Sequence, residues 1–184
     1  MRLKKLFICL LLACLMAGCG GEKPDLSYEV ESFAVDMSGY NGVKSVGHAF
    51  RGVSPAEVFR ALEENGSAVF YLGYTGCHFC QKTVKVLNEA ALELGVTVYY
   101  IDGYSTVYPL NDENHYDQKL IEALNDYLRT DENGEKALYT PHVFTIINGK
   151  IAESMISYDD TGNEEKDLEN LGKTYRKMLE PFKS

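Results

Sequence analysis

The chain has 184 residues, 45% of them hydrophobic and 24% charged, which is enough for one domain with its own core and too little for two ordinary ones. Its 18 basic and 27 acidic residues give a formal net charge of −9, which speaks against a nucleic-acid-binding groove because such a groove needs a basic surface. The five cysteines are the feature to explain.

The N-terminus has the layout of an export signal. Three basic residues within the first five positions precede the apolar run 6–15, and small residues then lead to Cys19. The run is shorter than the roughly 20 residues that span a bilayer. The letters LMAGC resemble the lipobox of bacterial lipoproteins, with Met16 where Leu is usual. The resemblance implies that residues 1–18 are removed as a lipoprotein signal peptide and that Cys19 then carries the lipid.

Lipidation on Cys19 predicts a bacterial lipoprotein anchored on the extracytoplasmic face of the cell membrane. Removal of the signal would take three bases and no acid, and would leave a net charge of −12. Cys9 and Cys14 would leave with the signal, so Cys77 and Cys80 are the thiols that remain for chemistry. The alternatives are a plain cleaved signal peptide, an uncleaved short anchor, or a lipobox that ends at Cys14.

Residues 19–42 are polar and acidic, as expected for a tether that lets a domain stand off the membrane. Alternating apolar residues at 26–30 permit a short edge strand within it. The folded domain is expected over 43–184.

Strand and helix patterns alternate along that domain. The expected strands are 43–50, 67–74, 96–101, 143–147 and 150–156. The expected helices are 55–65, 77–94, 120–128 and 164–179. Ser54 and Glu57 are spaced as a capping box for the first helix, and Asn148-Gly149 is a strong hairpin signal. Residues 103–116 have no period and are expected to form a loop, which could select substrates or simply connect. This order predicts a mixed sheet with helices on both faces.

Cys77 and Cys80 are two residues apart at the start of the helix expected over 77–94. The backbone N–H groups and dipole of a helix N-terminus favour a thiolate at the first cysteine. That thiolate can attack a disulfide, and the second sulfur, one turn away, can resolve the mixed disulfide that forms. We therefore expect Cys77 to be the nucleophile and Cys80 the more deeply placed resolving cysteine.

The chain resembles thioredoxin-fold proteins in its element order, in the strand that leads into Cys77-His78-Phe79-Cys80, and in Thr140-Pro141 ahead of VFTIINGK. The resemblance implies a thioredoxin-like α/β fold with a mixed four- to five-stranded sheet. It implies thiol-disulfide oxidoreductase activity that needs no metal and no cofactor beyond the redox-active disulfide. It also implies that Pro141 is a cis-proline packed against the cysteines and that Thr140 offers backbone atoms to a substrate.

The local sequence YLGYTGCHFCQK resembles bacteriocin-transport accessory proteins and thioredoxin-like lipoproteins of Gram-positive bacteria. This implies exchange with the thiols or disulfides of exported proteins or peptides, and a redox partner that the chain does not encode. The chain departs from thioredoxins in having Tyr71 where they have a buried acid, Gly76 where they have tryptophan, and His78-Phe79 between the cysteines. A protonated His78 beside the nucleophile would stabilise its thiolate, so we expect His78 and Phe79 to tune the redox potential.

Several alternatives stay open. The two cysteines could form a permanent structural disulfide, or Cys77 could join His142 in a copper or zinc site. The chain could also be a non-catalytic module that holds an exported partner in the groove around Cys77 and Pro141. The remaining candidates are expected to have packing or surface roles: His48, His115, Tyr99, Tyr100, Tyr104 and Tyr108.

Overall fold

The computed structural model describes residues 23–184 apart from 106, 112 and 157–160. The expected signal peptide 1–18 and lipid site Cys19 therefore lie outside the described residues. Within the described ranges, no helix combines the length and the apolar character needed to cross a membrane.

Five strands form one mixed sheet in the order β1-β3-β2-β4-β5. Their bounds are β1 Phe50–Gly52, β2 Ala68–Gly73, β3 Val98–Asp102, β4 His142–Ile147 and β5 Lys150–Ile156. The first three in sequence are parallel, while β4 runs antiparallel to both β2 and β5. The central strand β2 is buried along its whole length, as its continuous apolar run predicts.

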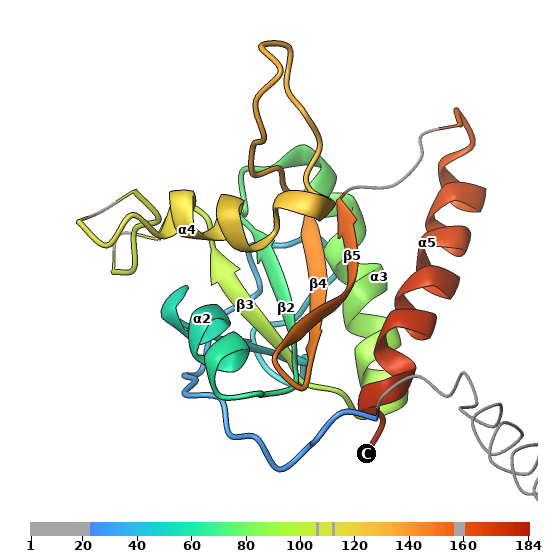
Figure 1. Ribbon diagram of the computed structural model, residues 1–184. Coiled ribbons are helices and arrows are strands. Elements are labelled where there is room, and N and C mark those ends of the chain that lie inside the picture. Colours follow the sequence, from blue (N-terminus) through green and yellow to red (C-terminus); the bar gives the residue numbers. More distant parts are fainter. Residues whose placement is uncertain (1–22, 106, 112, 157–160) are drawn as a thin grey trace, which may run out of the picture.

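Helices cover both faces of the sheet (Figure 1). The helices are α2 Ala56–Glu63, α3 His78–Leu94, α4 Tyr116–Ala123 and α5 Glu164–Leu179, with short 3-10 turns at Asn125–Tyr127 and Glu180–Phe182. Successive side chains of β2 alternate between the faces. Val69 and Tyr71 pack in the core with α3 and α5, whereas Phe70 and Leu72 pack with α2 and α4. This confirms the expected thioredoxin-like α/β fold, with five strands.

The first strand and the fourth helix differ from their expected bounds. The strand expected over 43–50 occupies only Phe50–Gly52, because Gly42 and Gly47 adopt positive φ angles and the chain between them turns. The helix expected over 120–128 begins earlier, at Tyr116, and ends in a 3-10 turn. Tyr116 therefore belongs to a helix, not to the expected loop.

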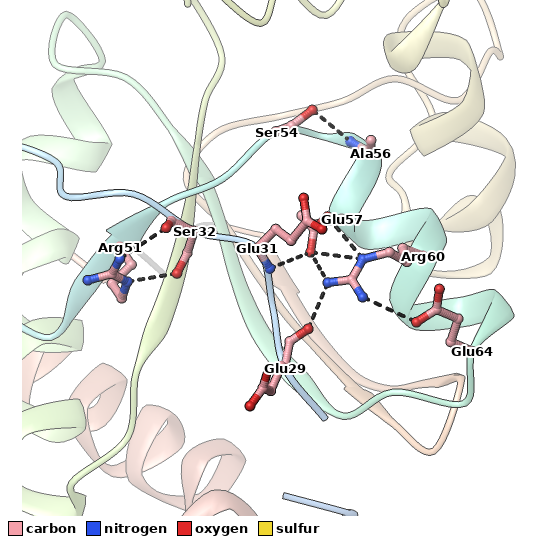
Figure 2. A network of polar contacts seen from close by, with 9 residues as sticks. All are labelled: Glu29, Glu31, Ser32, Arg51, Ser54, Ala56, Glu57, Arg60 and Glu64. Carbon is pink, nitrogen blue, oxygen red and sulfur yellow. Dashed lines mark hydrogen bonds and ion pairs between the residues drawn. The ribbon is translucent and has the colours of Figure 1, made fainter. Parts of the chain in front are cut away.

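The expected capping box at α2 does not form. Pro55 occupies the position before the helix and no side chain caps it there, although Ser54 Oγ accepts the N–H of Ala56 at 3.3 Å. Among the described residues, the Glu57 carboxylate does not bond the backbone at the helix start. It accepts the N–H of Glu31 at 2.9 Å and pairs with Arg60 Nη2 at 2.6 Å (Figure 2). The glutamate thus ties the helix to the preceding chain.

Residues 23–42 are here called the N-terminal segment, and they pack on the domain. The sequence predicted a tether over 19–42 that lets the domain stand off the membrane, and for residues 23–42 this prediction is corrected. Met37 and Tyr40 are 0% and 2% exposed and belong to the core beneath α3. Phe33 exchanges two backbone hydrogen bonds of 2.9 Å with Gly52, and this isolated bridge takes the place of the edge strand expected at 26–30. Burial of these two apolar side chains favours packing of the N-terminal segment on the domain.

Candidate functional site

Cys77 and Cys80 form a disulfide at the start of α3, directly after the turn that follows β2. Cys77 is the residue before the first helical turn, and its sulfur accepts the N–H of Cys80 at 3.1 Å. The Cys77 side of the disulfide reaches the surface, with 7% of the residue exposed, while Cys80 is fully buried. The helix N-terminus and this N–H would both stabilise a thiolate on Cys77.

The Thr140-Pro141 step faces the Cys77 sulfur, and its peptide bond is cis. The sulfur lies 3.7 Å from the Thr140 carbonyl oxygen and 3.5 Å from Thr140 Oγ1. This placement follows from the sheet, because β4 pairs with β2 so that His142 lies opposite Leu72, near the end of β2. The structure thus brings together two sets of residues that are 63 positions apart in the sequence.

His78 and Phe79, the expected tuning residues, open the helix and are both exposed. Their rings meet edge to face with centroids 5.6 Å apart. Phe79 is 43% exposed, so an apolar ring lies at the surface beside the disulfide. Any effect of these two residues on the redox potential stays a prediction.

Gln81 is a site residue that the motif did not indicate. Its Nε2 donates to the carbonyl oxygens of Thr75 at 2.6 Å and Gly39 at 2.9 Å, and its Oε1 accepts the N–H of Asn41 at 2.7 Å. One side chain therefore holds the loop before Cys77 against the N-terminal segment. A glutamine next to the second cysteine was visible in the sequence, but its partners at 39–41 were not.

Tyr71 lies where thioredoxins have a buried acid, and it is completely buried. Its ring stacks on Tyr100 with centroids 5.6 Å apart and also meets Phe50 and Tyr40. Burial raises the pKa of Tyr71 well above its ordinary value, so its hydroxyl stays protonated at neutral pH and cannot serve as a base. The Tyr40 hydroxyl donates to that of Tyr100 at 3.1 Å.

The other tyrosines and histidines take different places. Of the four tyrosines expected to pack, Tyr100 is buried whereas Tyr104 is 73% exposed. His142 is fully buried, and its Nε2 lies 2.7 Å from Ser154 Oγ. Burial lowers the pKa of His142 to about 4, so it is neutral at pH 7. Among the described residues, no group of three or more His, Cys, Asp or Glu side chains is placed to hold a metal ion.

The sequence predicts His48 and His115 at the surface or at a strand edge. His48 Nε2 lies 3.1 Å from the Val35 carbonyl oxygen, and its Nδ1 accepts the N–H of Phe50 at 3.1 Å. His115 is exposed at the start of α4. His48 thus lies in the loop before β1, and His115 in the loop before α4.

Neither protein-family models nor curated proteins match the sequence. Among solved structures, oxidized thioredoxin O2 from Arabidopsis thaliana is 20% identical, with a TM-score of 0.40, over 67% of this chain and 94% of its own. A putative oxidoreductase with a thioredoxin fold is 15% identical with a TM-score of 0.43, over 66% and 94%. Oxidised thioredoxin from Plasmodium falciparum is 13% identical with a TM-score of 0.39, over 68% and 96%. The strand order, the disulfide before α3 and the proline step before β4 define the fold independently of these matches.

Proposed function

We propose that the protein is a thiol-disulfide oxidoreductase that is anchored to the extracytoplasmic face of the membrane through lipid on Cys19. The observation that carries the redox proposal is the Cys77–Cys80 disulfide, in which Cys77 is 7% exposed and faces Thr140 while Cys80 is fully buried. A permanent structural disulfide would not need one cysteine to be more exposed than the other. A disulfide that closes a two-residue loop also gains little closure entropy.

The exchange proceeds in two balanced steps. In the reduced protein, the Cys77 thiolate attacks one sulfur of a partner disulfide, so a mixed disulfide forms and the partner's other sulfur leaves as a thiolate. The Cys80 thiolate then attacks Cys77, re-forms the Cys77–Cys80 bond and releases the second partner thiol. Two electrons pass to the partner, and the same steps in reverse oxidise a partner dithiol. The difference between the reduction potentials of the partner and of the Cys77–Cys80 pair sets the direction.

The backbone around Thr140 supports substrate binding at this point. The Thr140 carbonyl lies next to the Cys77 sulfur and can accept an N–H from an extended partner segment. The partners we propose are exported proteins or peptides, bacteriocins included, in keeping with the likeness of YLGYTGCHFCQK to transport accessory proteins and surface lipoproteins. A separate redox partner would restore the resting state.

Insulin reduction tests the proposal directly. We expect the wild type, supplied with a small-thiol reductant, to accelerate precipitation of the insulin B chain, and the Cys77→Ala variant to lose this acceleration. A Cys80→Ala variant should accumulate mixed disulfides that nonreducing gels resolve. Wild-type activity no higher than that of the Cys77→Ala, Cys80→Ala double variant would favour a non-catalytic binding module instead.

Anchoring is tested separately. In cells fed a labelled fatty acid, the wild-type chain should incorporate label and fractionate with membranes, and Cys19→Ala should do neither. Label that persists in Cys19→Ala and disappears in Cys14→Ala would move the lipid site to the earlier cysteine.

A further inference from the structure

An apolar cavity of about 330 Å³ opens over the ends of β1 and β3, at the same end of the sheet as the disulfide. Three parts of the chain line it, namely the N-terminal segment, these strand ends and the loop after β3. Its principal lining residues are Phe33, Val53, Tyr100, Ile101, Val107 and Tyr108. The volume falls at the lower end of the range of ligand pockets, roughly 300–1,000 Å³.

A hydrogen bond and a ring contact connect the disulfide to the loop that lines the cavity. The N–H of Cys77 donates to the Tyr74 carbonyl oxygen at 3.1 Å, and the Tyr74 ring packs on the Tyr104 ring with centroids 4.3 Å apart. Tyr104 belongs to the loop whose next residues line the cavity. The N–H of Gly103 also donates to the Gly73 carbonyl oxygen at 2.9 Å, which fixes this loop to the end of β2. A segment bound at Cys77 can therefore run over these rings to the cavity.

The rim of the cavity exposes large apolar side chains. Val107 is 74% exposed, Phe33 43% and Tyr108 37%, and the last two stack with ring centroids 5.8 Å apart. The floor is formed by side chains such as Val53 and Ile101, which are almost fully buried. Contiguous exposed apolar surface around a concavity is typical of binding sites.

Two polar side chains that line the cavity, Asp102 and Ser105, form hydrogen bonds within the loop after β3. The Asp102 carboxylate accepts the N–H of Tyr104 at 3.0 Å, and Ser105 Oγ accepts the N–H groups of Val107 and Tyr108 at 3.2 and 3.0 Å. None of the described residues that line the cavity is a lysine or an arginine, and the carboxylate of Asp102 disfavours an anion there. The cavity thus suits an uncharged apolar group.

We propose that this cavity is a substrate subsite that receives an aromatic or large aliphatic side chain of the polypeptide whose disulfide exchanges with Cys77. The inference rests on the proposed function, because the subsite binds a side chain of the same polypeptide whose cysteine reacts with Cys77. The cavity lies over β1 and β3, and β1 is two strands from β2, which corresponds to roughly 10 Å at about 4.8 Å per strand. An extended peptide covers that span in about three residues.

Synthetic peptides with one cysteine, activated as a mixed disulfide with a nitrothiobenzoate group, test the subsite in the full chain. The Cys77 thiolate attacks the peptide sulfur and releases coloured nitrothiobenzoate, and Cys80 then frees the reduced peptide. We expect a phenylalanine about three residues from the cysteine, on one side only, to raise the second-order rate constant of the reduced protein, measured over a single turnover, about tenfold over serine at the same position. Val107→Glu should abolish this gain. Val46→Glu, a matched control at a valine that is 76% exposed and does not line the cavity, should keep it.

Equal rates for the phenylalanine and serine peptides, or a preference unchanged in Val107→Glu, would overturn the subsite. Hydroxyethyl disulfide, which has no side chain to bind, provides the second arm. If Val107→Glu exchanges it at the wild-type rate, the lost preference lies in the subsite; if the wild type exchanges neither substrate, the proposed function itself fails. Self-association that Val107→Glu removes, without any phenylalanine preference, would assign the cavity to a second copy of the chain and so overturn the proposal.

Discussion

The side chain of Gln81 connects three backbone groups that come from two distant parts of the chain. Each hydrogen bond of this kind contributes about 0.5–1.5 kcal/mol, less where water competes. The bonds place the loop before Cys77 and the turn at 39–42 in fixed positions. We therefore regard Gln81 as a positioning residue that shapes the surface beside the disulfide.

We expect Gln81→Ala to lower the free energy of unfolding by about 1–2 kcal/mol, because three hydrogen bonds are lost. Hydrogen exchange at the Asn41 amide, whose N–H donates to this side chain, should become faster. Urea unfolding and exchange measured by NMR check both effects. Gln118→Ala changes an exposed glutamine on α4 and is the matched control. Unchanged protection of Asn41 would mean that the hydrogen bonds do not hold this turn.

His142 predicts a specific pH dependence of stability. Burial lowers its pKa to about 4, whereas the unfolded chain has the ordinary value of 6.5. Between these values the unfolded chain binds a proton that the folded chain does not, so stability is complete above pH 6.5 and decreases as the pH falls towards 4. The difference amounts to about 3 kcal/mol.

Urea unfolding followed from pH 7.5 to 4 measures this loss. His142→Gln keeps a polar group near Ser154 but does not titrate, so its stability should change less than that of the wild type over the same range. His115→Asn, at an exposed histidine whose positive φ asparagine tolerates, should keep the wild-type pH dependence. Identical profiles for all three proteins would exclude His142 as the group responsible.

Helix α2 holds the N-terminal segment through one charged pair. Arg60 Nη2 bonds both the Glu57 carboxylate at 2.6 Å and the Glu29 carbonyl oxygen at 2.7 Å (Figure 2). The Arg60 guanidinium also lies 5.0 Å from the centre of the Tyr28 ring. The Glu57 side chain is only 7% exposed, so it depends on this partner. The element therefore has two roles, since it covers the sheet and also anchors the preceding chain.

Arg60→Ala should cost about 2 kcal/mol of stability, because it leaves a nearly buried carboxylate without its cation. The Glu31 amide, which donates to that carboxylate, should exchange faster in the variant. Glu64→Ala removes only an exposed partner of the same arginine and should cost less than about 0.5 kcal/mol. Equal losses in the two variants, measured by urea unfolding, would contradict the buried role of Glu57.

Elements with a strong local pattern were predictable from the sequence. The apolar run of β2, the period of α3 up to Gly95, and the Asn148-Gly149 turn, where both residues adopt positive φ angles, are all present as expected. The capping box failed because Glu57 found a distant partner in Glu31 that no local rule includes. In the site, Cys77 and Cys80 were recognisable by spacing, whereas the contacts of Gln81 depend on tertiary structure.

At the scale of the molecule, the domain begins earlier than its pattern indicates. Met37 and Tyr40 are single apolar residues in an acidic stretch, so no periodicity marks them, yet both complete the core beneath α3. Burial of each side chain contributes roughly 1.5–3 kcal/mol, a large part of the 5–15 kcal/mol that stabilises a typical domain. The segment also contributes Phe33 to the proposed subsite.

A chain that starts at residue 43 should therefore be less stable than one that starts at residue 23, by at least about 3 kcal/mol. Thermal and urea unfolding of the two chains measure the difference. In the chain that starts at 23, the combined Met37→Ala, Tyr40→Ala change should reproduce most of the loss without any truncation. A truncated chain with undiminished stability would show that the segment lies on the domain without supporting it.

If Cys19 carries the proposed lipid, the place where the N-terminal segment begins would determine which end of the domain faces the membrane. Asn148, in the β4–β5 turn, accepts the N–H of Asp25 at 2.9 Å and donates to the Lys23 carbonyl oxygen at 3.0 Å. This turn lies at the end of the sheet opposite the disulfide, about 20 Å away along the six residues of β4. From Cys19 to Lys23 the chain can extend at most about 14 Å. A lipid on Cys19 would therefore hold the hairpin end close to the bilayer, and the disulfide would face outward, where bulky thiol reagents should reach reduced Cys77 as fast on vesicles as in detergent.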